Sequence, residues 1–139
     1  MGYKSPGSYA VTIGHSTYDP ADSTTYLFGS ALGNPPETIT GKRIIKFPVG
    51  GIIKRCVSVM ICNVVSSNEN ISLYIRKNDT TDYLVDTVGN VTAAKIFDNL
   101  AMNIPIAIGD YVELKIVTPA WATNPTGVLS SGSIYIEIE

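Results

Sequence analysis

The chain closes with GDYVELKIVTPAWATNPTGVLSSGSIYIEIE (residues 109–139), and this stretch indicates the fold class. Apolar residues fall on every second position in 111–117, and the same alternation returns in 133–138. Each run therefore has one apolar face and one polar face, which is typical of an antiparallel strand with a core on one side. The loop between the two runs holds Trp121, the single tryptophan of the chain.

The same kind of run recurs from the N-terminus onward. Short segments rich in β-branched and aromatic residues are cut by Gly, Pro, Asn, Asp and Ser, which is the pattern of an all-β protein. The segment 52–65 is long for one strand and is expected to bend or bulge, and 91–100 is the one place where a short helix could form instead. The predicted strands are Tyr9–Ile13, Thr24–Gly29, Arg43–Pro48, Ile52–Val65, Ile71–Lys77, Tyr83–Val88, Ala94–Asn99, Met102–Ile106, Tyr111–Val117 and Ser133–Ile138.

About ten short strands in 139 residues predict a single-domain antiparallel β-sandwich. A jelly roll is the first choice. An immunoglobulin-like sandwich is the second, because it expects a Cys…Trp…Cys order that this chain lacks. One domain is expected to span residues 1–139, with residues 1–8 as a flexible N-terminal arm.

The composition argues against several function classes. The net charge is −2, and no basic stripe is present of the kind that a nucleic-acid-binding domain shows. No apolar run approaches the roughly 18 residues of a membrane span, and the first residues lack the apolar segment of a signal peptide. We therefore expect no nucleic-acid partner and no membrane insertion, with synthesis in a cytoplasm.

The chain is poor in residues that carry catalysis or bind metals. Cys56 and Cys62 lie six positions apart in one predicted strand, roughly 20 Å at its full extension, so they are expected to be reduced structural thiols. His15 is the only histidine, too few for a zinc site and weak support for a catalytic triad. The acidic segments 19–22 and 78–82 could offer oxygens to calcium, but they read better as turns. We expect no enzyme and no cofactor.

Three tyrosines stand on the polar side of predicted strands. Tyr74, Tyr111 and Tyr135 alternate with core positions, and the segment 52–65 is apolar on both faces. A strand that is apolar on both faces of a two-layer sandwich needs a partner to cover its outer side. The three tyrosines are therefore predicted to lie in the interface of a homotrimer. The alternative is that they stabilise cross-strand pairs on an exposed sheet.

Trp121 allows two interpretations. Pro119 and Pro125 restrict the loop around it. In the first interpretation the indole folds back and plugs the open end of the sandwich, and in the second it is an exposed platform for a sugar or a surface partner. Val128 and Leu129 in the same loop favour the plug.

The segment IPIAIGDYVELKIVTPAW with the terminal SGSIYIEIE resembles the end of trimeric jelly rolls, the tumour-necrosis-factor-like and complement-head-like domains. The segments NENISLYIRKNDTTDYLVDTVG, YDPADSTTYLFG, PPETITGKRIIKFPVGGIIKRC and PAWATNPT are similar to small virion proteins of tailed bacteriophages. The likeness is one of pattern and touches most of the chain from Tyr18 on.

This resemblance implies a non-enzymatic phage protein, a trimeric fibre or knob domain of a head fibre or tail tip that serves in virion attachment or decoration. Its partners would be two further copies of the chain, other virion proteins and a bacterial surface glycan. Its place would be the virion, after synthesis in the host bacterial cytoplasm. The alternative from a different class is a carbohydrate-binding β-sandwich module of a cellular protein.

Overall fold

The computed structural model describes residues 7–63, 69–89 and 94–138. These residues form ten strands and no helix, so they contain no helix that could cross a membrane. All ten predicted strands are present, and Ala94–Asn99 forms a strand where a helix was the alternative for 91–100; residues 91–93 lie outside the described residues. In chain order the strands are β1 (Ser8–Tyr18), β2 (Thr25–Phe28), β3 (Ile45–Lys46), β4 (Gly51–Ile61), β5 (Ile71–Lys77), β6 (Thr81–Val88), β7 (Ala94–Asn99), β8 (Ile104–Ile106), β9 (Tyr111–Val117) and β10 (Val128–Ile138).

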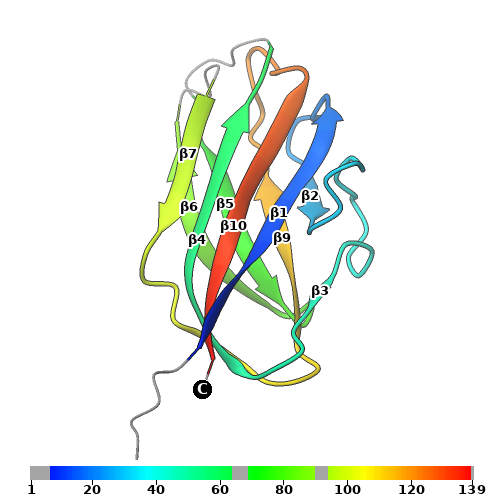
Figure 1. The fold of residues 1–139 in the computed structure, drawn as a ribbon. Coiled ribbons are helices and arrows are strands. Elements are labelled where there is room, and N and C mark those ends of the chain that lie inside the picture. Colours follow the sequence, from blue (N-terminus) through cyan, green and yellow to red (C-terminus); the bar gives the residue numbers. More distant parts are fainter. Residues whose placement is uncertain (1–6, 64–68, 90–93, 139) are drawn as a thin grey trace, which may run out of the picture.

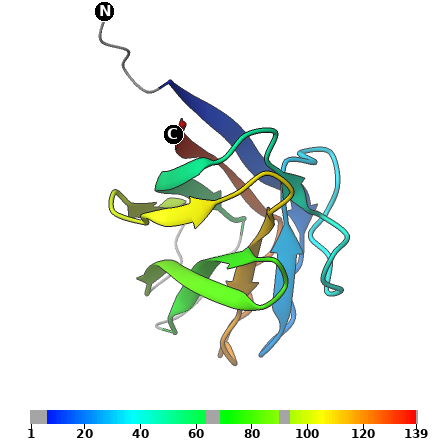
Figure 2. The ribbon, with the colours of Figure 1, turned by 90° about the horizontal axis from the view of Figure 1, so that it is seen from below.

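The strands form two antiparallel sheets that pack face to face (Figure 1). The first sheet has the order β1-β10-β4-β7, with β8 beside the start of β4, and lies in front in Figure 1. The second sheet has the order β2-β9-β5-β6, with β3 beside the start of β9. Figure 2, which looks along the strands, shows the two sheets as two layers.

The connectivity is that of a jelly roll. Without the short strands β3 and β8, eight strands remain. The first of them pairs with the last (β1 with β10), the second with the seventh (β2 with β9), the third with the sixth (β4 with β7), and the fourth with the fifth (β5 with β6). This is one long antiparallel hairpin rolled into two sheets. The jelly-roll prediction is confirmed.

The core lies between the sheets, where the alternation of each strand places its apolar side. In β9 the inward residues Val112, Leu114 and Ile116 are fully buried, and Ile134 and Ile136 of β10 face them from the first sheet. The alternation of apolar and polar residues therefore places the core between the sheets. Each sheet keeps an outer face, and the side chains on the two outer faces differ.

The long strand β4 carries the irregularity that its length suggested. Arg55 pairs with Tyr135, but the next pair along the ladder joins Ile53 to Ile136, so Lys54 is an extra residue on β4. Such a β-bulge leaves two successive side chains on one side of the strand. Residues 64 and 65, where the predicted strand ended, lie outside the described residues.

The two termini of the sandwich lie close together at its lower end (Figure 1). Most of the expected N-terminal arm, residues 1–8, lies outside the described residues. Its last residue, Ser8, already belongs to β1 and pairs with Glu137 of β10.

Candidate functional site

Trp121 is part of the core. Its side chain is 5 % exposed and packs in the apolar cluster between the sheets. This burial is what the plug interpretation expects and what an exposed platform does not. An indole in this place closes the end of the sandwich where the β1–β2 and β9–β10 loops meet.

The acidic residues of the segment 19–22 hold this loop in place. The Asp22 carboxylate accepts hydrogen bonds from the Trp121 backbone N–H (3.3 Å) and the Asn124 side-chain amide (2.8 Å). The Asp19 carboxylate accepts a hydrogen bond from the Gly127 backbone N–H (2.8 Å). Both carboxylates thus link the β1–β2 loop to the β9–β10 loop through hydrogen bonds. Within the described residues, no group of three or more acidic, histidine or cysteine side chains is arranged so that it could hold a metal ion.

His15 faces the core from β1. It is 1 % exposed, and its ring lies edge-on to Tyr18 and Phe28, with centroids 5.1 and 4.8 Å away. Burial lowers the pKa of this imidazole, because a charged ring would lose its hydration. The Ser16 carbonyl lies 2.8 Å from Nδ1, so Nδ1 carries the proton and donates it; the unprotonated Nε2 has no hydrogen-bond partner among the described residues. A ring held in this way packs as part of the core.

Cys56 is a free thiol on β4, and Cys62 comes just after that strand. Cys56 is fully buried, and burial raises its pKa to about 12. The Cys62 thiol is half-buried, and burial raises its pKa as well. Neutral thiols are poor nucleophiles, so these residues act as small apolar side chains.

The three tyrosines point outward as predicted, but they do not share one face. Tyr74 in β5 and Tyr111 in β9 lie on the outer side of the second sheet, whereas Tyr135 in β10 lies on the outer side of the first. Alternation predicts whether a side chain faces in or out, but it does not say to which sheet the strand belongs. The three tyrosines therefore do not lie together on one face of the chain, as a single interface surface would require.

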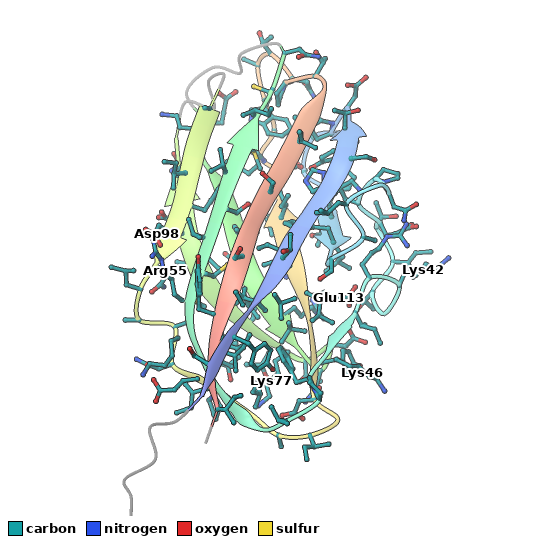
Figure 3. All side chains as sticks on the ribbon, viewed as in Figure 1. Lys42, Lys46, Arg55, Lys77, Asp98 and Glu113 are labelled. Atoms are coloured by element: carbon teal, nitrogen blue, oxygen red, sulfur yellow. The ribbon has the colours of Figure 1, made fainter. Side chains whose placement is uncertain are left out.

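The outer side of the second sheet is largely occupied by its own chain. Glu113, labelled in Figure 3, points outward from β9 and is nevertheless 0 % exposed, because residues 40–43 of the β2–β3 connection cover it. Its carboxylate accepts hydrogen bonds from the Gly41 N–H (2.8 Å), the Thr40 hydroxyl (3.2 Å) and the Arg43 N–H (3.4 Å). The pattern of apolar and polar residues in β9 does not indicate this role, since alternation predicts that Glu113 is exposed.

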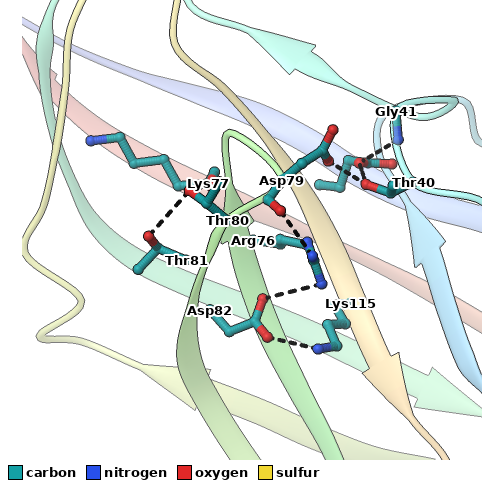
Figure 4. A network of polar contacts seen from close by, with 10 residues as sticks. Thr40, Gly41, Arg76, Lys77, Asp79, Thr80, Thr81, Asp82 and Lys115 are labelled. Carbon is teal, nitrogen blue, oxygen red and sulfur yellow. Dashed lines mark hydrogen bonds and ion pairs between the residues drawn. The ribbon is translucent and has the colours of Figure 1, made fainter.

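Charged pairs also lie on this face, beside the exposed Leu84. Asp82 binds Lys115 (2.6 Å) and lies 3.8 Å from Arg76, and the Lys115 ammonium lies 5.6 Å from the centre of the Tyr74 ring (Figure 4). The Tyr111 hydroxyl donates to the Asp79 carboxylate (3.0 Å), and the Thr40 hydroxyl also bonds that carboxylate. The hydrogen bonds from Thr40 and then Tyr111 hold the pKa of Asp79 below its usual value. Tyr74 and Tyr111 thus have partners within their own chain.

The upper half of the outer side of the first sheet is different, because it is nearly free of charge. The cross-strand row through Gly14, Ser131, Val59 and Ile96 contains no ionisable side chain. A Cβ built on Gly14 would lie 2.6 Å from a methyl carbon of the Leu32 side chain, so Leu32 closes this row at its β1 edge.

The exposed apolar side chains gather at the upper half of this sheet. Ile96 is 60 % exposed, Ile61 41 % and Val59 36 %, and Val59 pairs directly with Ile96. Exposed apolar groups that adjoin one another mark an interaction surface more often than isolated ones do. We call this the apolar face: Leu32, Val57, Val59, Ile61, Ala94, Ile96 and Leu129, with the small residues Thr12, Gly14, Ser131 and Ser133 between them.

The charged pair nearest to the apolar face is internally neutralised. Arg55 and Asp98, labelled in Figure 3, are joined by two hydrogen bonds of 3.1 Å each. A neutral bidentate pair at the rim of an apolar surface does not repel a second copy of the same surface. The sequence signal for this face was the run 52–65 with apolar residues on both parities, and the structure assigns Val57, Val59 and Ile61 to its outer side.

Comparisons with protein-family models, with curated proteins and with solved structures find no match to this chain.

Proposed function

We propose that the chain is a non-enzymatic structural protein of a bacteriophage virion, a trimeric fibre or knob domain that serves in attachment or decoration. Its partners are two further copies of itself and other virion proteins. Its place is the virion, after synthesis in the host bacterial cytoplasm.

The observation that carries the proposal is the contrast between the two outer faces. The second sheet carries the β2–β3 connection and charged pairs along with the exposed Leu84, whereas the first sheet exposes Val59, Ile61 and Ile96 side by side. Apolar surface exposed in this way costs free energy in water, about 25 cal/mol for each Å² left uncovered. A second copy of the chain can cover it without bringing like charges together.

The position of β10 adds support. This strand lies in the middle of the first sheet, between β1 and β4, and contributes Leu129, Ser131 and Ser133 to the apolar face. The trimeric jelly rolls that the C-terminal sequence resembles place their final strand near the threefold axis. Three copies related by a threefold rotation then form a closed ring, in which the same contact is repeated between each neighbouring pair.

Light scattering coupled to size exclusion at micromolar concentration tests the proposal. We expect a species of three times the chain mass of 14.9 kDa. A clean monomer at these concentrations contradicts it.

The alternative is a carbohydrate-binding module of a cellular protein. One observation favours it: Tyr135 is 41 % exposed, and it is the aromatic side chain of the described residues that solvent reaches most. The same measurement separates the two functions, because such a module is expected to be a monomer.

A further inference from the structure

A groove of about 440 Å³ opens at the lower end of the first sheet, below the apolar face. Three strands build it: β1 contributes Ser8, Tyr9 and Ala10, β10 contributes residues 135–137, and β4 contributes Lys54. The groove is separate from the plugged upper end of the sandwich where Trp121 lies.

Two local features of the sequence produce the hollow. Across the β1–β10 ladder the small residues Ser8 and Ala10 stand opposite Glu137 and Tyr135, so the larger side chains have no large neighbour on β1. On the other side the β-bulge inserts Lys54 as an extra residue of β4. A bulge re-aims a side chain relative to a regular ladder, and here it places Lys54 in the lining of the groove.

The groove brings together an aromatic ring and two opposite charges. The Arg55 guanidinium, which Asp98 fixes through two hydrogen bonds, lies 5.8 Å from the centre of the Tyr135 ring. The ring is thus held in place while it remains 41 % exposed. Among the described residues, the side chains of Lys54 and Glu137 make no hydrogen bond or ion pair.

We propose that this groove binds a pyranose ring of a neutral sugar, with its C–H face against Tyr135 and its hydroxyls on Lys54 and Glu137. The aromatic ring offers a flat apolar surface with a polar edge. The ammonium donates and the carboxylate accepts, so the two together satisfy hydroxyl groups that do both. The lining has one positive and one negative side chain, so it does not favour a charged sugar.

The opposite sheet holds a comparison within the same molecule. Tyr74, Lys115 and Asp82 also combine an aromatic ring, an ammonium and a carboxylate. There the ammonium and the carboxylate bind each other at 2.6 Å, so a ligand would have to compete with that pair. In the groove, Lys54 and Glu137 have no such partner among the described residues, which is the difference that a ligand would exploit.

The inference rests on the proposed function only for the origin of the sugar, a glycan of the bacterial surface. The test is a titration of ¹⁵N-labelled protein with methyl α-D-glucopyranoside, methyl α-D-galactopyranoside and N-acetylglucosamine, with glucuronate as the charged probe. We expect at least one neutral sugar to shift the amides of residues 8–10 and 135–137, and glucuronate to bind at least about tenfold more weakly. The titration is repeated on the Ile96→Glu variant, which is expected to be a monomer. Sugar binding can then be measured even if self-association of the unaltered protein covers the groove.

Variants then assign the binding to the groove. Tyr135→Ala is expected to weaken the sugar by about tenfold, the loss of roughly 1.4 kcal/mol, and Lys54→Met by a smaller factor. The matched control Tyr74→Ala is expected to leave the affinity unchanged. If Tyr135→Ala fails to fold, Lys54→Met and Glu137→Gln decide in its place.

Three results overturn the proposal: no neutral sugar shifts these amides at 100 mM, glucuronate binds as well as the best neutral sugar, or the groove variants bind like the unaltered protein. The oligomeric mass is measured separately. If the protein is a trimer that binds no sugar, only the proposed sugar binding in the groove is refuted. If it is a monomer that binds a sugar, only the proposed trimer is refuted.

Discussion

Replacing Trp121 by alanine removes the plug at the upper end of the sandwich. The side chain is 5 % exposed, so nearly all of its surface is taken out of water on folding. A tryptophan buries roughly 150–250 Å², which at about 25 cal/mol per Å² corresponds to roughly 4–6 kcal/mol. Among the described residues the indole N–H has no hydrogen-bond partner, so no such bond is lost. Because the loop can partly collapse into the space, we expect Trp121→Ala to lower the free energy of unfolding by about 3–5 kcal/mol.

Urea unfolding followed by far-ultraviolet circular dichroism measures this loss, with Tyr135→Ala as the control for an exposed aromatic residue. Trp121→Phe refills most of the space and is expected to recover more than half of the stability. In the unaltered protein Trp121 is the only tryptophan, so its emission should be blue-shifted and insensitive to acrylamide. A red-shifted, freely quenched emission with a loss below about 1 kcal/mol, the range of surface changes, would refute the reasoning.

Three further predictions address other parts of the fold. Burial lowers the pKa of His15 below its unfolded value, so the neutral form contributes stability that is complete above about pH 6.5 and is lost as the pH falls toward the folded pKa. The free energy of unfolding measured from pH 7 to 5 should therefore fall with pH, and His15→Phe should reduce this dependence. Glu113→Ala leaves two backbone N–H groups of the β2–β3 connection without their acceptor and should lower the free energy of unfolding by about 1–3 kcal/mol per group that stays buried. A protease should then cut within residues 37–44, and Glu113→Gln should largely prevent this cleavage; a Glu113→Ala variant that resists the protease as well as the unaltered protein would contradict the role of Glu113 in holding the connection. Deleting Ile134–Glu139 removes the end of a strand that pairs on both sides and should abolish soluble expression, whereas deleting Met1–Pro6 should not; a soluble, cooperatively folding product of the first deletion would show that this strand is dispensable.

Much of the fold could be predicted from the sequence, because alternation of apolar residues is a local property of each strand. The bounds of β5, β7 and β9 agree with the prediction, and the buried positions of β9 follow its alternation. The bulge in β4 was signalled by the length of its apolar run. The burial of Trp121 could be inferred from the apolar residues that follow it.

The candidate surface could be predicted only in part, since it depends on which strands become neighbours. Alternation placed Tyr74 and Tyr135 outward but could not show that they lie on opposite sheets. The burial of Glu113 results from a connection that joins β2 to β3 and crosses the outer face, and no pattern within β9 reports it. The groove near Lys54 likewise arises from a bulge and from small residues on a strand distant in sequence.

If the apolar face of the first sheet holds copies of the chain together, as we propose, a substitution on that face should separate them, and a matched substitution on the other outer face should not. Ile96 on β7 and Leu84 on β6 are both exposed, by 60 % and 49 %, but they lie on opposite outer faces. Light scattering should show that Ile96→Glu is a folded monomer of 14.9 kDa, whereas Leu84→Glu keeps the mass of three chains. An Ile96→Glu variant that retains the trimeric mass, or a Leu84→Glu variant that alone dissociates, would contradict the assignment of the interface to this face.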